Sequence, residues 1–198
     1  MLLIQHRVND VEALRRVPRD RGVEVDIRDY DGALRAAHDP LSSGPPLEDL
    51  LAEYDHALLI LNVKCDGLEG RLRELMRRHR VQRYFFLDCA GPSLVRLARS
   101  GVREVAVRFS EFEPLSACLA FAGLIDWVWV DCFTRLPLDP AAHAQLRRAG
   151  FRLCLVSPEL QGHPAAEIDR YRALLADTPV DAVCTDFPAR WGGAPGEA

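Results

Sequence analysis

The sequence lacks paired cysteines. No C-x-x-C pair occurs, and a structural zinc site is therefore not expected, because such sites take closely spaced Cys and His ligands. In a reducing compartment we expect free thiols that pack as small apolar groups. The cysteines stand singly along the chain: Cys65, Cys89, Cys118, Cys132, Cys154 and Cys184.

A basic leader and long apolar runs are also absent. The segment Met1–Ile4 leads directly to His6 and Arg7, which is not the pattern of a secretory signal. No apolar run approaches the roughly 20 residues that a membrane-spanning helix needs. We therefore expect a cytoplasmic protein with no transmembrane segment. The net charge of −4 gives no long-range attraction to nucleic acid, so no nucleic-acid partner is expected. The sequence leaves the oligomeric state open.

Short apolar runs and helical patterns alternate along the 198 residues. The runs are nearly continuous in apolar character, as strands buried on both faces are. The predicted strands are Leu2–His6, Val23–Arg28, Ala57–Lys64, Tyr84–Asp88, Glu104–Phe109, Trp127–Asp131, Arg152–Val156 and Ala182–Asp186. The predicted helices are Asp10–Arg19, Leu47–Tyr54, Gly67–His79, Pro92–Arg99, Pro114–Phe121, Pro140–Arg148 and Ala165–Leu175.

Strict alternation of eight strands with helices predicts an α/β protein with a parallel sheet, and eight strands is the number that closes a barrel. We predict a compact (β/α)8 TIM barrel in one domain, residues 1–188, with a flexible tail, residues 189–198. The usual last helix is expected to be missing or vestigial. An open doubly wound sheet is the alternative, disfavoured because no strand leads into a Gly-x-Gly-x-x-Gly turn or a Walker loop.

Polar residues follow the apolar runs of the first third: His6-Arg7, Glu24-x-Asp26 and His38-Asp39. Charged residues at strand ends are typical of the catalytic mouth of a barrel, and two histidines with two carboxylates provide the groups for acid–base chemistry on a metal-held substrate.

Strand parity narrows this candidate site. Glu24 and Asp26 share a face of their strand, as do Asn62 and Lys64 on the next. Glu24, Asp26 and the Asn62 side-chain oxygen suit Mg²⁺ or Ca²⁺, while Lys64 and Arg7 supply positive charge for an anion. A buried ion-pair network without a metal is the alternative.

Other residues at strand ends could contact a substrate or form ion pairs, with substrate contact favoured at Arg108 and Asp131. Trp129 could stack on a sugar or cover a lipid edge, although packing in the core is the simpler interpretation. Four histidines away from strand ends are expected to be solvated. The strand-end residues are Asp88, Arg108, Asp131, Glu159 and Asp186, and the histidines are His56, His79, His143 and His163.

These motifs resemble the signature of glycerophosphodiester phosphodiesterases, in the superfamily that includes phosphatidylinositol-specific phospholipase C. The resemblance rests on His6-Arg7, Glu24-x-Asp26, residues 31–40, Asn62-Val63-Lys64 and residues 180–188, in the expected order over nearly the whole chain. It implies a short, divergent member of that family.

The resemblance also implies roles. His6 and His38 would be the general acid and base, and Glu24, Asp26 and Asn62 would hold a divalent cation, Mg²⁺ or Ca²⁺. Arg7 and Lys64 would bind the phosphate of a small-molecule phosphodiester while a neighbouring hydroxyl attacks phosphorus to give a cyclic phosphate.

Three departures from the family pattern stand out. Asn62 replaces an acidic metal ligand, which removes one negative charge from the site. Val8 replaces the glycine that follows His-Arg, and the usual helical cap insertion after the His-Asp segment is absent.

Two functions follow from this resemblance. The first is a metal-dependent hydrolase, or related lyase, that acts on a glycerophosphodiester or related sugar or lipid phosphodiester. The second is a catalytically weakened barrel that binds a phosphate ligand or serves as a regulatory protein. The retained pair His6 and His38 favours the enzyme.

Overall fold

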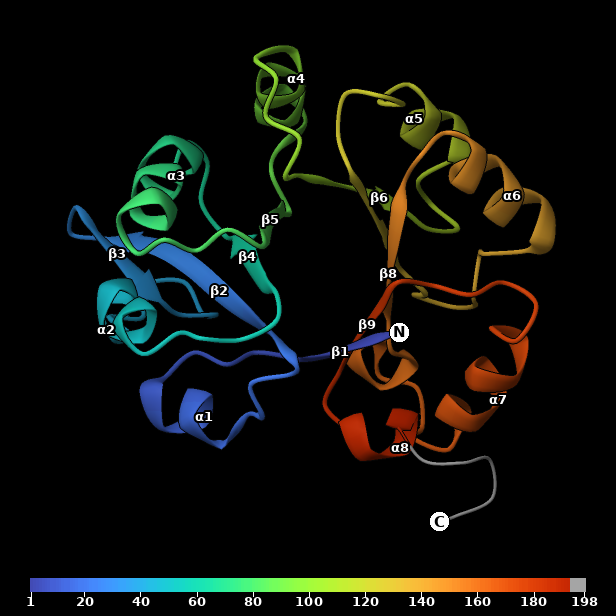
Figure 1. The fold of residues 1–198 in the computed structure, drawn as a ribbon, viewed down its shortest axis with the longest axis horizontal. Helices are drawn as coiled ribbons and strands as arrows, with labels where there is room; N and C mark the ends of the chain where they lie inside the picture. The colour runs from blue at the N-terminus through green and yellow to red at the C-terminus, as the bar shows by residue number, and fades with distance from the viewer. Residues whose placement is uncertain (193–198) are drawn as a thin grey trace. The chain divides into compact units, whose positions relative to one another are not determined.

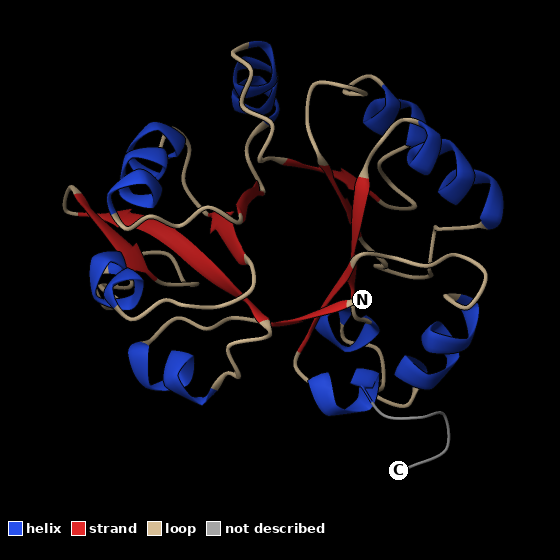
Figure 2. Ribbon diagram, viewed as in Figure 1, coloured by secondary structure: helices blue, strands red, loops and turns tan. Residues whose placement is uncertain are grey.

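The computed structural model describes residues 1–192, along which strands and helices alternate (Figures 1 and 2). All eight predicted strands are present, most of them one or two residues shorter than predicted. The strands are β1 (Leu2–Gln5), β2 (Gly22–Tyr30), β3 (Ala33–Ala36), β4 (Leu59–Val63), β5 (Tyr84–Leu87), β6 (Ala106–Phe109), β7 (Trp127–Val130), β8 (Arg152–Val156) and β9 (Ala182–Thr185). The helices are α1 (Val11–Arg16), α2 (Leu47–Ala52), α3 (Glu69–Arg78), α4 (Gly91–Arg99), α5 (Leu115–Leu119), α6 (Pro140–Arg148), the 3₁₀ helix η1 (Pro158–Gln161), α7 (Glu167–Leu174) and α8 (Pro188–Gly192).

The chain divides into two compact units: Gln5–Arg96, and Met1–Ile4 together with the chain from Leu97 on. In the first unit, β4 pairs in parallel with β2 and with β5. In the second, β6, β7, β8 and β9 pair in parallel in chain order. Parallel pairing of strands separated by helices is the βαβ arrangement that the alternation predicts.

Each unit buries its strands on both faces. Every residue of β4 is buried in the first unit, as is every residue of β7 and β9 in the second. The helices cover these strands with leucines such as Leu50 and Leu72 from α2 and α3, and Leu146 from α6, all three fully buried. The near-continuous apolar runs therefore correspond to central strands, as predicted.

The sequence prediction missed strand β3. It pairs antiparallel with β2, and the register Tyr30↔Ala33 leaves a two-residue turn, Asp31-Gly32. Both turn residues have positive φ, 52° and 75°, the geometry for which hairpins favour Asp-Gly. The hairpin returns the chain toward the carboxyl-terminal half of β2, where the Ala37 N–H donates to the Asp26 carbonyl at 2.9 Å. It therefore sets the position of His38.

The connection after β3 and the helix after β9 are both short. Residues 37–46 connect β3 to α2 with no helix or strand between them, as expected for a chain without the cap insertion. After β9 the vestigial last helix is α8, in which Trp191 is buried and donates from Nε1 to Ser157 Oγ at 2.8 Å. The first four residues of the predicted flexible tail thus belong to α8, and the rest of that tail lies outside the described residues.

The six cysteines all lie in the described part of the chain, and none of them forms a disulfide there. Cys118, Cys132, Cys154 and Cys184 are buried, in agreement with the prediction of small apolar packing. Over the same residues, no helix combines the length and the apolar character that crossing a membrane would need.

Candidate active site

Seven predicted site residues gather in the unit Gln5–Arg96. His6 and Arg7 follow β1, Glu24 and Asp26 lie in β2, His38 follows the hairpin strand β3, and Asn62 and Lys64 lie in and after β4. The parallel register aligns Asp26 with Asn62, which places both carboxylates of β2 beside the polar end of β4. Contacts among these side chains define the cluster.

Glu24 is a buried carboxylate, with 1% of its surface exposed. Its Oε1 accepts from Asn62 Nδ2 at 2.8 Å, and its Oε2 accepts from the Arg7 backbone N–H at 2.8 Å. Burial raises the pKa of Glu24 above its ordinary value, and the charge of Asp26 raises it further, against the opposing effects of His6 and the two hydrogen bonds. The surroundings of Glu24 therefore disfavour its ionised form.

Asp26 is as buried as Glu24, but more hydrogen-bond donors and positive groups surround it. Its Oδ2 accepts from Asn9 Nδ2 at 2.9 Å and lies 3.6 Å from Arg7 Nε, and its Oδ1 lies 3.3 Å from Lys64 Nζ. Burial alone would raise the pKa of Asp26, but the Asn9 hydrogen bond and the charges of Lys64 and His38 hold it below its ordinary value. Asp26 is thus the anionic centre of the cluster.

Each histidine faces one carboxylate. His38 Nδ1 lies 3.2 Å from Asp26 Oδ2, and His6 Nε2 lies 4.0 Å from Glu24 Oε2. The other ring nitrogen of His38, Nε2, is 3.4 Å from Arg7 NH2. A carboxylate beside an imidazole favours a proton on the nitrogen that faces it, which leaves the opposite nitrogen of His38 as the proton acceptor.

The structure adds residues that the sequence interpretation did not assign to the site. Asn9 forms a reciprocal pair with Asp26: it donates from Nδ2, and its Oδ1 accepts from the Asp26 N–H at 2.9 Å. Asp10 takes the capping position and accepts from the Ala13 N–H. The sequence feature that could have indicated this role is that Asn9 directly precedes Asp10, which caps the helix and leaves Asn9 available for another contact.

Arg28 is a second addition. It lies two residues after Asp26 on the same face of β2, and its guanidinium donates to the backbone carbonyl oxygens of His38 at 2.9 Å and Lys64 at 3.2 Å. It thereby ties the end of the hairpin to the end of β4. The parity argument that linked Glu24 with Asp26 extends to this residue.

The chemistry of the donor set fits a divalent cation. Asn62 Oδ1 is buried with no hydrogen-bond partner, a loss that costs roughly 1–3 kcal/mol for a polar group out of water. It accompanies the carboxylates of Glu24 and Asp26, and three oxygen-bearing side chains are the kind of ligands that Mg²⁺ and Ca²⁺ take. No three His, Cys, Asp or Glu side chains in the described residues are grouped to hold a metal.

Arg108 and Asp131 belong to the other unit and form an ion pair. Asp131 is fully buried and also accepts from Gln161 Nε2 at 2.7 Å, while Arg108 lies over the ring of Phe133 at 5.7 Å. The ion-pair interpretation is therefore correct for these two residues, and contact with substrate stays a prediction. Trp129 is 5% exposed, in keeping with packing in the core.

The expectation that four histidines are solvated was wrong for His56. This side chain is buried, its Nε2 lies 3.1 Å from the Val17 carbonyl oxygen, and burial lowers its pKa. His163 and His143 are half-buried, with Nε2 3.0 Å from the Cys132 carbonyl and 2.9 Å from the Pro179 carbonyl.

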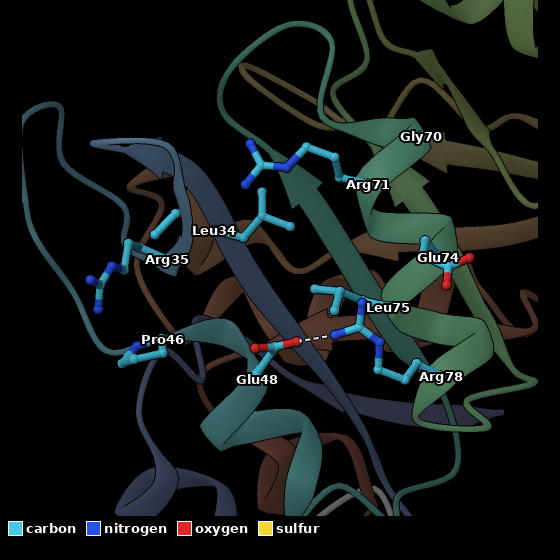
Figure 3. Close-up of a pocket in the computed structure, with 10 residues that line it drawn as sticks. Leu34, Arg35, Pro46, Glu48, Gly70, Arg71, Glu74, Leu75 and Arg78 are labelled. Carbon is cyan, nitrogen blue, oxygen red and sulfur yellow. Dashed lines mark hydrogen bonds and ion pairs between the residues drawn. The ribbon is translucent and has the colours of Figure 1, made fainter.

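A cavity of about 650 Å³ lies beside β3, α2 and α3, outside the cluster (Figure 3). Leu34 and Leu75 contribute its apolar wall, and Glu48 Oε1 accepts from Arg78 NH1 at 2.6 Å across it. None of the predicted site residues lines this cavity. Four of its charged residues, Glu48, Arg71, Glu74 and Arg78, form ion pairs, whereas the histidine–carboxylate cluster holds groups suited to proton transfer.

Comparison with solved structures finds close matches in fold. One is a glycerophosphoryl diester phosphodiesterase of Agrobacterium tumefaciens, with a TM-score of 0.70 and 16% identity over 96% of this chain and 97% of that one. A second from the same organism, named glycerophosphodiester phosphodiesterase, gives 0.67 and 15% over 98% and 100%. A third, from Parabacteroides distasonis, gives 0.67 and 14% over 96% and 84%.

These matches confirm the predicted fold class, a TIM-barrel-like α/β fold, and the resemblance to this group of enzymes at the level of structure. The low identity marks a divergent chain. No family model matches the sequence, and no curated protein matches it either.

Proposed function

We propose that this protein is a metal-dependent phosphodiesterase that cleaves a glycerophosphodiester, or a related sugar or lipid phosphodiester, by histidine acid–base catalysis. The observation that carries the proposal is the pairing of two histidines with two buried carboxylates: His38 with Asp26 and His6 with Glu24. The likeness in fold to solved glycerophosphodiester phosphodiesterases supports the same reaction class.

In this proposal His38 is the general base. Asp26 holds the proton on Nδ1, so Nε2 accepts the proton of the substrate hydroxyl next to the phosphodiester. The hydroxyl oxygen attacks phosphorus and the bond to the departing alcohol breaks. His6, protonated beside Glu24, gives its proton to that alcohol, and the products are the free alcohol and a cyclic phosphate. Attack of water then opens the ring in a hydrolase, whereas a lyase stops at the cyclic product.

Arg7 and Lys64 bind the phosphate oxygens in this scheme. Arg7 is half-exposed at 47% and Lys64 is 18% exposed, and both lie within 4 Å of Asp26. Positive groups placed before the reaction stabilise negative charge that develops on the phosphoryl oxygens. A bound Mg²⁺ or Ca²⁺, held by Glu24, Asp26 and Asn62, would supply further polarisation of a phosphoryl oxygen.

Phosphorus-31 NMR tests the proposal, because it separates diester, cyclic phosphate and monoester. We expect cleavage of glycerophosphodiesters in the presence of Mg²⁺ or Ca²⁺, slowing by a chelator, and no cleavage of an analogue that lacks the neighbouring hydroxyl. His6→Ala and His38→Ala should each lower turnover by about 10²–10⁴-fold, the usual contribution of a general acid or base.

His79→Ala, a change of the same kind on α3's carboxyl-terminal side, is the matched control and should leave turnover near that of the wild type. Near-normal turnover in both site variants would refute the assignment. Phosphate binding without turnover in the wild-type protein would instead favour a binding or regulatory role.

A further inference from the structure

Lys64 lies between two carboxylates. Its Nζ is 3.3 Å from Asp26 Oδ1 and 3.5 Å from Asp88 Oδ2. Asp26 is buried and engaged by Asn9 and His38 as well, but Asp88 is at the surface end of the cluster, with 29% of its side chain exposed. Any anion that approaches Lys64 therefore meets the negative charge of Asp88.

The backbone directs Asp88 to this position. β5 pairs with β4 in the register Asn62↔Leu87, so Asp88 is the first residue beyond the strand, at the level where β4 ends before Lys64. Asp88 has a φ of 57°, in the left-handed region that few residues other than glycine adopt. Strained backbone of this kind concentrates at functional sites, where the surrounding structure compensates its cost.

The charges of the cluster nearly balance. Asp26 and Asp88 offset the charges of Lys64 and Arg7. Glu24 adds a third carboxyl whose ionisation is opposed by burial, and it is faced by His6. These side chains alone therefore leave little excess positive charge to balance a second negative charge on a ligand of Lys64 and Arg7.

We infer that Asp88 sets the charge selectivity of this site: with Lys64 it admits a monoanionic phosphodiester and disfavours a dianionic phosphomonoester. The inference rests on the proposed function and deepens it. Hydrolysis of a phosphodiester releases a phosphomonoester that carries a second negative charge near neutral pH. Repulsion between that charge and Asp88 favours release of product over its retention.

Two small ligands isolate the effect. Methyl phosphate and dimethyl phosphate differ by one methyl group and, at pH 8, by one charge. A unit charge about 7 Å away, at an effective dielectric constant of about 40–80, changes affinity by roughly three- to eightfold. We therefore expect Asp88→Asn to raise the affinity for methyl phosphate relative to dimethyl phosphate by this factor, measured by titration calorimetry at low salt.

The variants are chosen to keep the fold. Asparagine, like aspartate, is enriched at positive φ, so Asp88→Asn preserves the backbone. Asp88→Glu keeps the charge and should keep the wild-type ratio. Asp66→Asn removes the same charge from an exposed residue two positions after Lys64 and should change the ratio by less than about twofold, because an exposed charge is screened by solvent.

The outcomes separate this inference from the proposed function. If both ligands bind and Asp88→Asn leaves their ratio unchanged, the role of Asp88 is refuted while the phosphate site stands. If neither ligand binds the wild-type protein or the variant, both the inference and the proposed phosphate site fail.

Discussion

Asn62 donates from its amide nitrogen to Glu24 while its buried oxygen has no partner. A carboxylate at this position would bring a third negative charge to Glu24 and Asp26, whereas the amide keeps the ligand geometry and omits the charge. The number of charged oxygens is a main determinant of affinity for Mg²⁺ and Ca²⁺. The proposed cation ligands therefore carry one negative charge fewer than three carboxylates would.

Substitution at this position tests that balance. We expect Asn62→Glu to tighten Ca²⁺ or Mg²⁺ binding by about tenfold, because the added oxygen is charged and Lys64 offsets part of the repulsion. Titration calorimetry on the metal-free forms measures the difference. Asn62→Ala is the control and should weaken binding. Equal or weaker affinity in the glutamate variant would show that Asn62 is no metal ligand.

The residues of the cluster could be predicted from the sequence because they lie at the ends of apolar runs, and because residues two apart on a strand share a face. Glu24, Asp26 and Asn62 were predicted to share one site, and their side chains do meet. The partners that fix them could not be predicted in the same way. Asn9 acts through a loop between β1 and α1 whose course depends on tertiary contacts, and His56 is buried by neighbours distant in sequence.

The hairpin of β2 and β3 carries His38 into the cluster, and an ion pair anchors it. Arg71 of α3 contacts Asp29 Oδ2 at 2.5 Å and donates to the Gly32 carbonyl at 2.7 Å. The Arg71 hydrogen bond holds the pKa of Asp29 below its ordinary value. This contribution to stability is present above the ordinary pKa of aspartate and is lost as pH falls through the lowered pKa in the folded state.

Removing this charge should loosen the hairpin in a pH-dependent way. We expect Asp29→Asn to melt at a lower temperature than the wild type at pH 6, and the difference to shrink as pH falls through the lowered pKa of Asp29, where the carboxylate takes up a proton. Thermal unfolding monitored by circular dichroism measures both. Asp31→Asn, in the exposed turn, serves as the control. A difference that stays constant as pH falls from 6 into the acid range would mean that charge does not anchor the hairpin.

At the level of elements, the sequence predicted the strands buried on both faces because their apolar character is continuous. It missed β3 because four residues with one arginine have neither a long apolar run nor a clear alternation. The local signal was the Asp31-Gly32 turn, which is typical of a two-residue hairpin. Helix α1 ends at Arg16, earlier than predicted, because Val17 precedes Pro18 and takes an extended conformation.

The two compact units are not two consecutive halves of the chain. β1 contributes Leu2–Ile4 to the unit built from the chain after Leu97, and the Leu2 N–H donates to the Asp181 carbonyl at 2.7 Å. Ile4 is fully buried. The carboxyl-terminal unit therefore depends on the first residues of the chain.

Cutting the chain between residues 96 and 97 should leave neither piece complete. We expect fragments 1–96 and 97–198 to show no cooperative thermal unfolding when prepared separately, because the second lacks β1 and exposes the edge of β9. Mixing the fragments should restore the transition seen in the intact chain. Circular dichroism measures both, and cooperative unfolding of fragment 97–198 alone would contradict the dependence on β1.

Lys64 is the only lysine in a sequence that has 25 lysine and arginine residues. Its ammonium lies at the centre of the cluster, so the only ε-amino group in the protein is also the proposed phosphate ligand. A reagent that acylates amines can modify only this nitrogen and the chain's own α-amino group. Mass spectrometry of the peptide that contains Lys64 would therefore report the occupancy of the site. A ligand that covers Lys64 would prevent its acylation and so reduce the amount of labelled peptide.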